Sequence, residues 1–193
     1  MIRPSRDEAK QAVKTLLAYV CDDPNRPGLE DTPERVIKGY EQDWCAGYQQ
    51  DPAEILKQFE DGAEYYSGIV FEGSIPLTSL CEHHLCSIFG YAHFGYIPDK
   101  RIVGLSKIPR LINVFAKRLM VQERMSSLIV DSFMQHVPCK GCGLVLRLRH
   151  MCMESRGVRL HNSVTTTSDL RGIFLNDEGT KAEFLGLVRN EGK

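Results

Sequence analysis

Residues 143–153 alternate between two kinds of side chain, and this alternation strongly limits how the chain can fold. Successive side chains of a β-strand point to opposite faces, so a period of two predicts a half-buried strand. One face carries two arginines between other side chains, and the opposite face is mainly apolar. The positions on the mainly apolar face are Leu144, Leu146, Leu148, His150 and Cys152. The pattern therefore places a histidine and a cysteine side by side, directed toward the same space.

Both helical and strand patterns occur in the rest of the chain. Apolar residues at helical spacing predict helices, and β-branched or aromatic residues between glycines predict strands. The expected helices cover residues 5–21, a segment starting at 31–34, and residues 52–59, 106–119, 121–136 and 180–188. The expected strands cover residues 68–76, 85–98, 143–153 and 164–170. We therefore expect an α+β fold, with a helical region over 1–65 and an antiparallel sheet covered by two helices over 66–193.

Composition excludes several classes of protein. A net charge of −1 over 193 residues argues against nucleic acid as the main partner. The chain has no run of about 18 apolar residues, so no membrane-spanning helix is expected. The first ten residues are charged and lack the apolar core of a signal peptide. Seven cysteines, an odd number, fit reduced thiols better than a disulfide framework, so we expect a cytoplasmic protein.

Thiols and imidazoles gather at two separate points of the chain. Cys81, His83 and His84 form the first group, and His150 and Cys152 form the second. A turn or helical start would bring Cys81 and His84 together, since they are three residues apart. These two residues and Cys152 could hold one zinc ion and leave the fourth position to water, as in catalytic zinc sites. His83 and His150 would remain available for proton transfer.

A simpler interpretation remains open for each of these residues. A single cysteine or histidine on a strand is more often a core residue than a metal ligand. Cys139 and Cys142 could form a second metal site or a redox pair, but a turn with two incidental thiols is the more economical reading. Cys86 is a third thiol close to the first group and could compete for metal or form a disulfide.

Basic residues recur beside helix starts. Lys107 and Arg110 lie three apart at the start of the helix expected from Ser106, where free backbone N–H groups would help to bind phosphate. Arg156 closely follows the expected strand at 143–153. For any single one of these cations, a place on a solvated charged surface is the simpler interpretation. Glu123 could accept hydrogen bonds from a guanine edge, although an acid in a first helical turn is favourable without any ligand.

Several segments together match one known family. The chain resembles the GTP cyclohydrolase I family, whose members have the tunnelling fold. The resemblance runs in order from about residue 28 and is weakest over residues 46–75. The matching segments are Asp31–Val36, Cys81–His84, Gly104–Ile108, Val121–Arg124, His150–Met153, Ser155–Val158, Thr165–Thr167 and Glu183–Leu185. Asp169 and Arg171 depart from the expected pattern, because smaller or uncharged residues would be expected there.

The resemblance implies a role for each matching position. Cys81, His84 and Cys152 match zinc ligands, and His83 and His150 match acid–base histidines. The matching substrate-binding positions are Arg35, Lys38, Ser106, Lys107, Arg110, Gln122, Glu123 and Arg156. Among these, the glutamate and glutamine match the pair that anchors guanine, the serine matches a ribose or phosphate contact, and the cations gather the triphosphate.

The implied fold and reaction follow from the same resemblance. The fold would be a four-stranded antiparallel sheet with two antiparallel helices on one face. The reaction would open GTP hydrolytically at C8, release formate and close a new ring to give 7,8-dihydroneopterin triphosphate, the first step of tetrahydrofolate and pterin biosynthesis. Members of the family are usually homodecamers with active sites shared between subunits.

Two other functions stay open at this level. A related tunnelling-fold enzyme could act on a pterin or deazapurine, although a substrate without a triphosphate would not need five cations. A zinc-stabilised scaffold or nucleotide-binding protein would close the fourth zinc position with a protein ligand, for which Cys86 is available.

Overall fold

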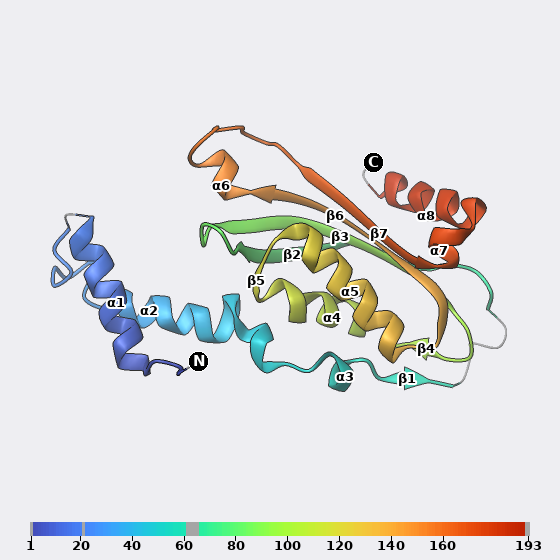
Figure 1. Ribbon diagram of the computed structural model, residues 1–193, viewed down its shortest axis with the longest axis horizontal. Helices are drawn as coiled ribbons and strands as arrows, with labels where there is room; N and C mark the ends of the chain where they lie inside the picture. The colour runs from blue at the N-terminus through green and yellow to red at the C-terminus, as the bar shows by residue number, and fades with distance from the viewer. Residues whose placement is uncertain (1, 21, 61–65, 192–193) are drawn as a thin grey trace. The chain divides into compact units, whose positions relative to one another are not determined.

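The computed structural model describes residues 2–20, 22–60 and 66–191 (Figure 1). Contacts divide the chain into two compact units, Met1–Ala46 and Gly47–Lys193. The second unit begins earlier than the expected boundary at residues 65 and 66. The reason is that residues 47–60 pack on the second unit: Leu56 is buried in its main core, and the Gly47 N–H donates to the Lys117 carbonyl.

The first unit contains two α-helices, α1 (Arg6–Tyr19) and α2 (Thr32–Gly39), and a π-helical turn η1 (Tyr40–Trp44). A capping box between Ser5 and Glu8 starts α1, which satisfies two free donors at the helix end. Arg6 joins the two helices through a two-pronged ion pair with Glu34. α1 thus agrees with the predicted segment 5–21 to within about two residues, and α2 begins within the predicted start at 31–34.

The second unit is built around a five-stranded sheet in the order β5-β2-β3-β6-β7. Its long strands are β2 (Val70–Cys81), β3 (Ser87–Pro98), β6 (Cys139–His150) and β7 (Thr165–Gly172). These four pair antiparallel with their neighbours, as expected. The short β5 (Leu119–Met120) adds a parallel strand beside the end of β2, which the sequence pattern did not reveal.

Two helices cover one face of the sheet, as predicted. They are α4 (Lys107–Ala116) and α5 (Gln122–His136), which lie along the sheet in roughly opposite directions (Figure 1). The main core lies between this pair and the leucines of β6. Phe133 of α5 packs against Phe94 and Tyr96 of β3, with ring centroids 4.8 and 5.1 Å apart. Burial of these apolar rings is the main force that holds the helices on the sheet.

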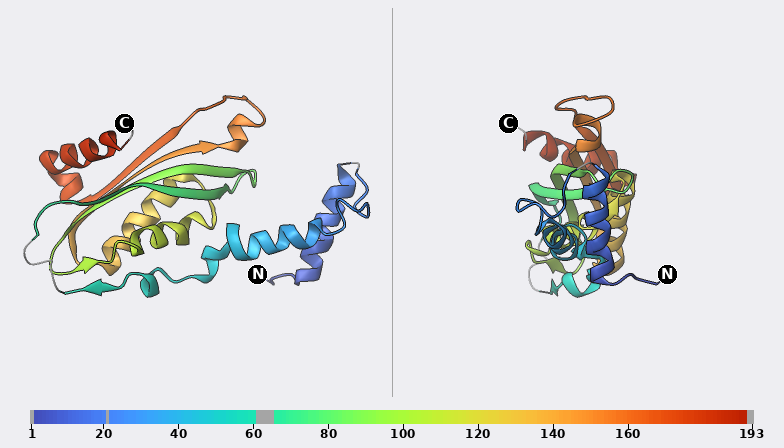
Figure 2. Two further views of the ribbon diagram at one scale, coloured as in Figure 1. Left: turned by 180° about the vertical axis from the view of Figure 1, so that it is seen from behind. Right: turned by 90° about the vertical axis from the view of Figure 1, so that its left-hand side faces the viewer.

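The opposite face carries a second, smaller core at one end of the sheet (Figure 2). Here α7 (Ile173–Asn176) and α8 (Glu178–Asn190) pack Phe174 and Phe184 against β6. Gly143 makes room for them, since a Cβ atom there would come within 2.8 Å of the Phe184 ring. The predicted C-terminal helix is therefore present and longer than expected, and it covers the face opposite α4 and α5.

Short elements complete the second unit. These are η2 (Ala46–Gln49), α3 (Pro52–Ile55), α6 (Met151–Glu154) and a two-stranded sheet of β1 (Gln58–Phe59) with β4 (Ile102–Val103). The helix predicted at residues 52–59 is therefore only one turn long and is followed by a strand. Among the described residues, no helix has the length and apolar character needed to cross a bilayer.

Asp169 and Arg171, which depart from the family pattern, form one ion-pair network. Arg171 donates to Asp131 of α5 at 2.8 Å, to Ser127 at 3.1 Å and to Asp169. Because Arg171 lies on the edge strand β7, these bonds tie that edge to α5. The two charged residues therefore have a structural explanation within this chain.

His93 offers a test of how burial affects stability. Its Nδ1 accepts a hydrogen bond of 3.2 Å from the backbone N–H of Ser74, a residue with φ of 53° in a bulge of β2. Burial lowers the pKa of His93; the charge of Arg147 lowers it further, and Glu191 opposes the shift. The unfolded chain therefore binds a proton at His93 more readily than the folded chain does. The free energy of unfolding therefore falls as the pH drops below about 6.5.

We expect the thermal midpoint to fall between about pH 8 and pH 5 by less in His93→Asn than in the unchanged chain. Asparagine can offer an oxygen to the Ser74 N–H but does not titrate in this range. Thermal unfolding at one fixed protein concentration would measure the difference. Equal pH dependence in the two proteins would show that His93 is not the group responsible.

Candidate metal centre and active site

Three predicted ligands meet at one end of the sheet, where the β2–β3 turn lies beside α6 (Figure 1). Cys81 is the last residue of β2, His84 lies in the following turn, and Cys152 lies on α6. The ligand atoms of these three side chains all lie within 4.8 Å of one another. Cys81 Sγ is 3.7 Å from His84 Nδ1. The sequence prediction that these residues converge is therefore confirmed.

Cys152 lies on a different kind of element from the predicted strand. β6 ends at His150, and the single helical turn α6 begins at Met151, so Cys152 is not on a strand. Glu154, at the end of α6, explains the change of direction. It is only 6% exposed, accepts from Arg149 Nε at 2.7 Å and also accepts from the backbone N–H of Asn162 at 3.3 Å. This buried carboxylate holds α6 and the following loop against β6.

The turn that carries His84 is also fixed by backbone bonds. The Cys81 N–H donates to the Cys86 carbonyl at 2.9 Å, and the Leu85 N–H donates to the Cys81 carbonyl at 2.9 Å. Leu85 has φ of 53°, a conformation that side chains rarely adopt outside tight turns. The ligand pair from β2 is therefore held by a specific turn.

The three side chains fit a zinc ion by their chemistry. Two thiols and one imidazole are the borderline-soft donors that zinc prefers. Cys81 is buried, Cys152 is half-buried and His84 is exposed, so the group opens to solvent on one side. Burial raises the pKa of the Cys152 thiol, and the neighbouring Cys81 sulfur raises it further. A bound cation would favour the thiolate forms of both.

The two predicted acid–base histidines, His83 and His150, lie close to this group in sequence, and each has its own polar partner. His83 is exposed, and its Nε2 lies 3.8 Å from Glu82 Oε1. The other oxygen of Glu82 accepts from Arg124 at 2.6 Å. His150 is half-buried, and its Nε2 lies 2.8 Å from the amide oxygen of Gln122. Burial lowers the pKa of His150, and the charge of Glu123 opposes that shift.

Gln122 and Glu123 begin α5 close to the metal group, because β5 pairs Met120 with Cys81. Glu123 is exposed and has no ion-pair partner among the described residues. Gln122, in contrast, is only 1% exposed and bonds with both ends of its amide. A side-chain contact of Gln122 with guanine would require the amide to leave those partners. Its pairing with His150 could not be recognised from the sequence.

The phosphate-binding candidates of α4 lie away from the metal group. α4 begins near β4, at the opposite end of the sheet from the β2–β3 turn (Figure 1). It has 10 residues, so it is about 15 Å long from its first residue to its last. Within the described part of one chain, Cys81 is therefore not close to the three α4 candidates, which are Ser106, Lys107 and Arg110. Ser106 precedes the helix but its side chain makes no capping bond.

The other predicted cations lie on separate segments. Arg156 is exposed just after α6, near the metal group in sequence. Arg35 and Lys38 lie on α2 in the first unit, and Arg35 forms an ion pair with Asp31 at 3.2 Å.

The remaining described cysteines offer no second metal group. Cys142 is buried with its thiol 3.8 Å from the Val130 carbonyl, and Cys139 Sγ lies 3.5 Å from Met134 Sδ. Burial raises the pKa of Cys139 to about 11. All six cysteines in the described residues are free, and Cys21 lies outside them. Cys139 and Cys142 are therefore incidental thiols, as the simpler interpretation had it, but they lie on strand β6 and not in the predicted turn.

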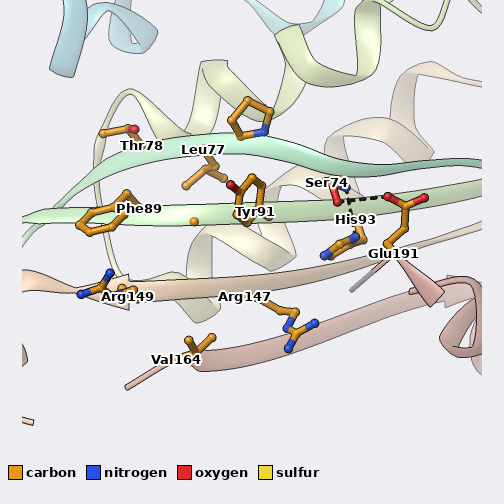
Figure 3. A pocket seen from close by; sticks show the side chains of 12 residues that line it. Ser74, Leu77, Thr78, Phe89, Tyr91, His93, Arg147, Arg149, Val164 and Glu191 are labelled. Carbon is orange, nitrogen blue, oxygen red and sulfur yellow. Dashed lines mark hydrogen bonds between the residues drawn. The ribbon is translucent and has the colours of Figure 1, made fainter. Parts of the chain in front are cut away.

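A cavity of about 840 Å³ lies on the sheet face opposite α4 and α5 (Figure 3). His93, Tyr91, Arg147 and Arg149 are among the residues that line it. The Arg149 guanidinium lies 5.2 Å from the centroid of the Phe89 ring. The lining includes none of the predicted metal, acid–base or substrate-binding residues, so this cavity is separate from the metal group.

Comparisons with known proteins identify the family of the chain. The sequence model of the GTP cyclohydrolase I family matches residues 9–189. The chain is 49% identical over 178 residues to GTP cyclohydrolase 1 of Janthinobacterium sp. (strain Marseille), covering 92% of this chain and 89% of that protein. It is also 49% identical over 183 residues to GTP cyclohydrolase 1 of Campylobacter jejuni subsp. jejuni serotype O:6, covering 94% of each.

A solved structure of an archaeosine synthase QueF-Like in the apo form aligns with a TM-score of 0.44 at 10% identity. The alignment covers 55% of this chain and 96% of that one, and it is too distant to support a conclusion about function. The family match and the identities above are decisive by themselves. The chain is a hydrolytic enzyme, and it belongs to the GTP cyclohydrolase I family.

Proposed function

We propose that this chain is a zinc-dependent enzyme that opens GTP at C8, releases formate and forms 7,8-dihydroneopterin triphosphate. The observation that supports this most directly is the convergence of Cys81, His84 and Cys152 beside two histidines that are not needed as ligands. We propose a cytoplasmic location, which suits the free cysteines in the described residues. The product would enter tetrahydrofolate and pterin biosynthesis.

The metal would be held by Cys81, His84 and Cys152. A bound zinc ion supplies a Lewis acid that makes hydroxide available near neutral pH. The protein contributes a ligand group that is buried at Cys81 and exposed at His84, so that substrate can approach from the solvent side.

Proton transfer is assigned to the two other histidines. His83 is exposed on the turn next to His84, where it can protonate a ring nitrogen of guanine as the C8–N bond breaks. His150 is held by Gln122 on the other side of the group and serves the later ribose opening and rearrangement. Glu123, exposed at the start of α5, would accept from the guanine N1–H and exocyclic amine.

Triphosphate binding is assigned to cations from more than one part of the assembly. The proposed contacts are Arg35, Lys38, Ser106, Lys107, Arg110 and Arg156. Since the start of α4 lies at the far end of the sheet from Cys81, a neighbouring copy is needed to complete the site. We therefore propose a homo-oligomer with shared active sites, a decamer as in other family members. Joining sheet edges between copies would also protect β7 and the open part of β2.

Incubation of the zinc-loaded protein with GTP tests the proposed reaction. Equal amounts of formate released and GTP consumed, together with the absorbance of a pterin, are the expected result. A zinc-loaded, folded protein that yields no formate would refute the function.

Mixed oligomers test the sharing of sites between copies. We expect His83→Ala and Lys107→Ala each to be inactive alone, but to recover activity when coexpressed. In a random mixture about one quarter of the sites would take an intact His83 from one copy and an intact Lys107 from its neighbour. The measurement is formate release by purified mixed oligomers, whose composition is checked by native mass spectrometry.

The matched control pairs His83→Ala with His150→Ala. Both changes fall in the same half of the proposed site, so coexpression should restore no activity. Mixed His83→Ala and Lys107→Ala oligomers without recovered activity would show that both residues serve one site within a single copy. Activity of Lys107→Ala alone would show that Lys107 is not required.

A further inference from the structure

Gln122 is a buried polar side chain whose partners are all defined. It is the first residue of α5, and its amide nitrogen donates to the Leu146 carbonyl at 3.3 Å and the Thr165 carbonyl at 3.1 Å. The same nitrogen lies 3.1 Å from Thr167 Oγ1. Its amide oxygen lies 2.8 Å from His150 Nε2. Strands β6 and β7 therefore fix one end of the amide, and the histidine meets the other end.

These partners determine which end of the amide is which. A backbone carbonyl can only accept a hydrogen bond, so the atom that faces Leu146 and Thr165 must be the NH₂ group. The reversed amide would point its oxygen at two carbonyl oxygens that cannot donate to it, and only the Thr167 hydroxyl could do so. The oxygen of Gln122 must therefore face His150.

The orientation of the amide in turn determines the tautomer of His150. An amide oxygen is only an acceptor, so His150 must donate to it through Nε2–H. In a neutral imidazole the other nitrogen, Nδ1, then carries the lone pair. Nδ1 has no hydrogen-bond partner among the described residues.

We propose that Gln122 is a positioning residue that locks His150 in the Nε2–H tautomer and presents Nδ1 as the nitrogen that accepts a proton from the substrate. This inference rests on the proposed role of His150 in the reaction. It also gives a purpose to the Thr165–Thr167 segment, which matches the family but contributes no residue to the proposed chemistry. Thr165 and Thr167 hold the far end of the amide.

The bonds that orient Gln122 do not depend on substrate. They come from two paired strands, β6 and β7, in which Leu146 lies opposite Thr167 and Leu148 opposite Thr165. The histidine is therefore oriented before GTP arrives, which removes a conformational cost from the reacting state. The opposite tautomer would place an N–H where the substrate requires an acceptor.

Two substitutions separate positioning from simple packing. Gln122→Met keeps the length of the side chain but removes the acceptor for His150, whereas Thr167→Val removes one contact at the opposite end of the amide. We expect Gln122→Met to lower kcat about 10–100-fold, with little change in KM or zinc content. Thr167→Val should lower the thermal midpoint and lower kcat by much less than Gln122→Met does, because the Leu146 and Thr165 carbonyls still hold the amide.

The tautomer can be measured independently of activity. In a magic-angle-spinning ¹⁵N spectrum of the zinc-loaded, histidine-labelled oligomer, His150→Gln identifies the His150 signals. We expect Nε2 protonated and Nδ1 unprotonated in the unchanged chain, and a mixture of tautomers in Gln122→Met. If Gln122→Met fails to fold, the spectrum of the unchanged chain still decides whether the predicted tautomer is present.

Each outcome supports or overturns the proposal. A proton on Nδ1 in the unchanged chain overturns it, as does an unaltered tautomer in folded Gln122→Met. A kcat that is equally lowered in Gln122→Met and Thr167→Val shows a structural role alone. Failure of the unchanged chain to release formate would refute the proposed function, whereas the spectrum would still judge whether Gln122 sets the tautomer.

Discussion

Cys152→Ala is expected to lose both the bound metal and the activity. Cys152 supplies one of two thiol ligands, and its sulfur lies within 4.8 Å of the donor atoms of Cys81 and His84. Two remaining ligands hold zinc far less tightly, and without the metal the hydrolytic step has no activated hydroxide. We expect formate release to fall by at least about a thousandfold. Metal analysis after gel filtration should show zinc falling from one ion per chain toward none.

Cys86→Ala is the matched control, since Cys86 is a half-buried thiol in the same turn but outside the metal group. It should keep zinc and most of the activity. Full zinc content in Cys152→Ala, or loss of zinc in Cys86→Ala, would show that the ligand set has been assigned wrongly.

The second large effect is expected from His83→Ala. His83 is exposed beside a ligand but is not part of the group of donor atoms that could hold a metal. Its loss should therefore leave zinc in place and remove an acid–base group, which lowers kcat by about 10²–10⁴-fold. Steady-state kinetics and metal analysis on the same sample would measure both effects.

His161→Ala is a suitable control, because this exposed histidine lies in the loop between α6 and β7. It should change kcat little. A His83→Ala protein that keeps nearly full turnover would contradict the role of His83. Loss of zinc from His83→Ala would instead identify His83 as a ligand.

Much of the fold could be predicted because its strands and helices are strongly patterned. The alternation in residues 143–153 predicted β6, and helical spacing after Ser106 and Val121 predicted the two covering helices. The end of β6 could not be predicted in this way. Period-two alternation continues through Cys152, but the chain turns into α6, held by the Glu154–Arg149 pair. A contact made only after folding decided that boundary.

The pairing of two metal ligands could be predicted from the sequence, whereas the surroundings of His150 could not. Cys81 and His84 belong to one short turn, so their spacing alone brings them together. His150 is bonded to Gln122 of α5, whose other partners come from β6 and β7, and only the folded chain shows that Gln122 is enclosed there. Likewise, the distance between the start of α4 and the metal group depends on the length of the sheet. The separation of the α4 residues from the metal group, on which the proposed sharing of sites rests, therefore became visible only in three dimensions.

The proposed function depends on a zinc ion that keeps one coordination position open to solvent. Zinc-edge X-ray absorption of the loaded, unchanged protein tests this directly, since sulfur and lighter ligands scatter at different distances. Cys81, His84 and Cys152 predict two sulfurs, one imidazole nitrogen and one further light atom from solvent. A first shell with three sulfurs would mean that Cys86 closes the site, and it would contradict a hydrolytic role in favour of a structural zinc.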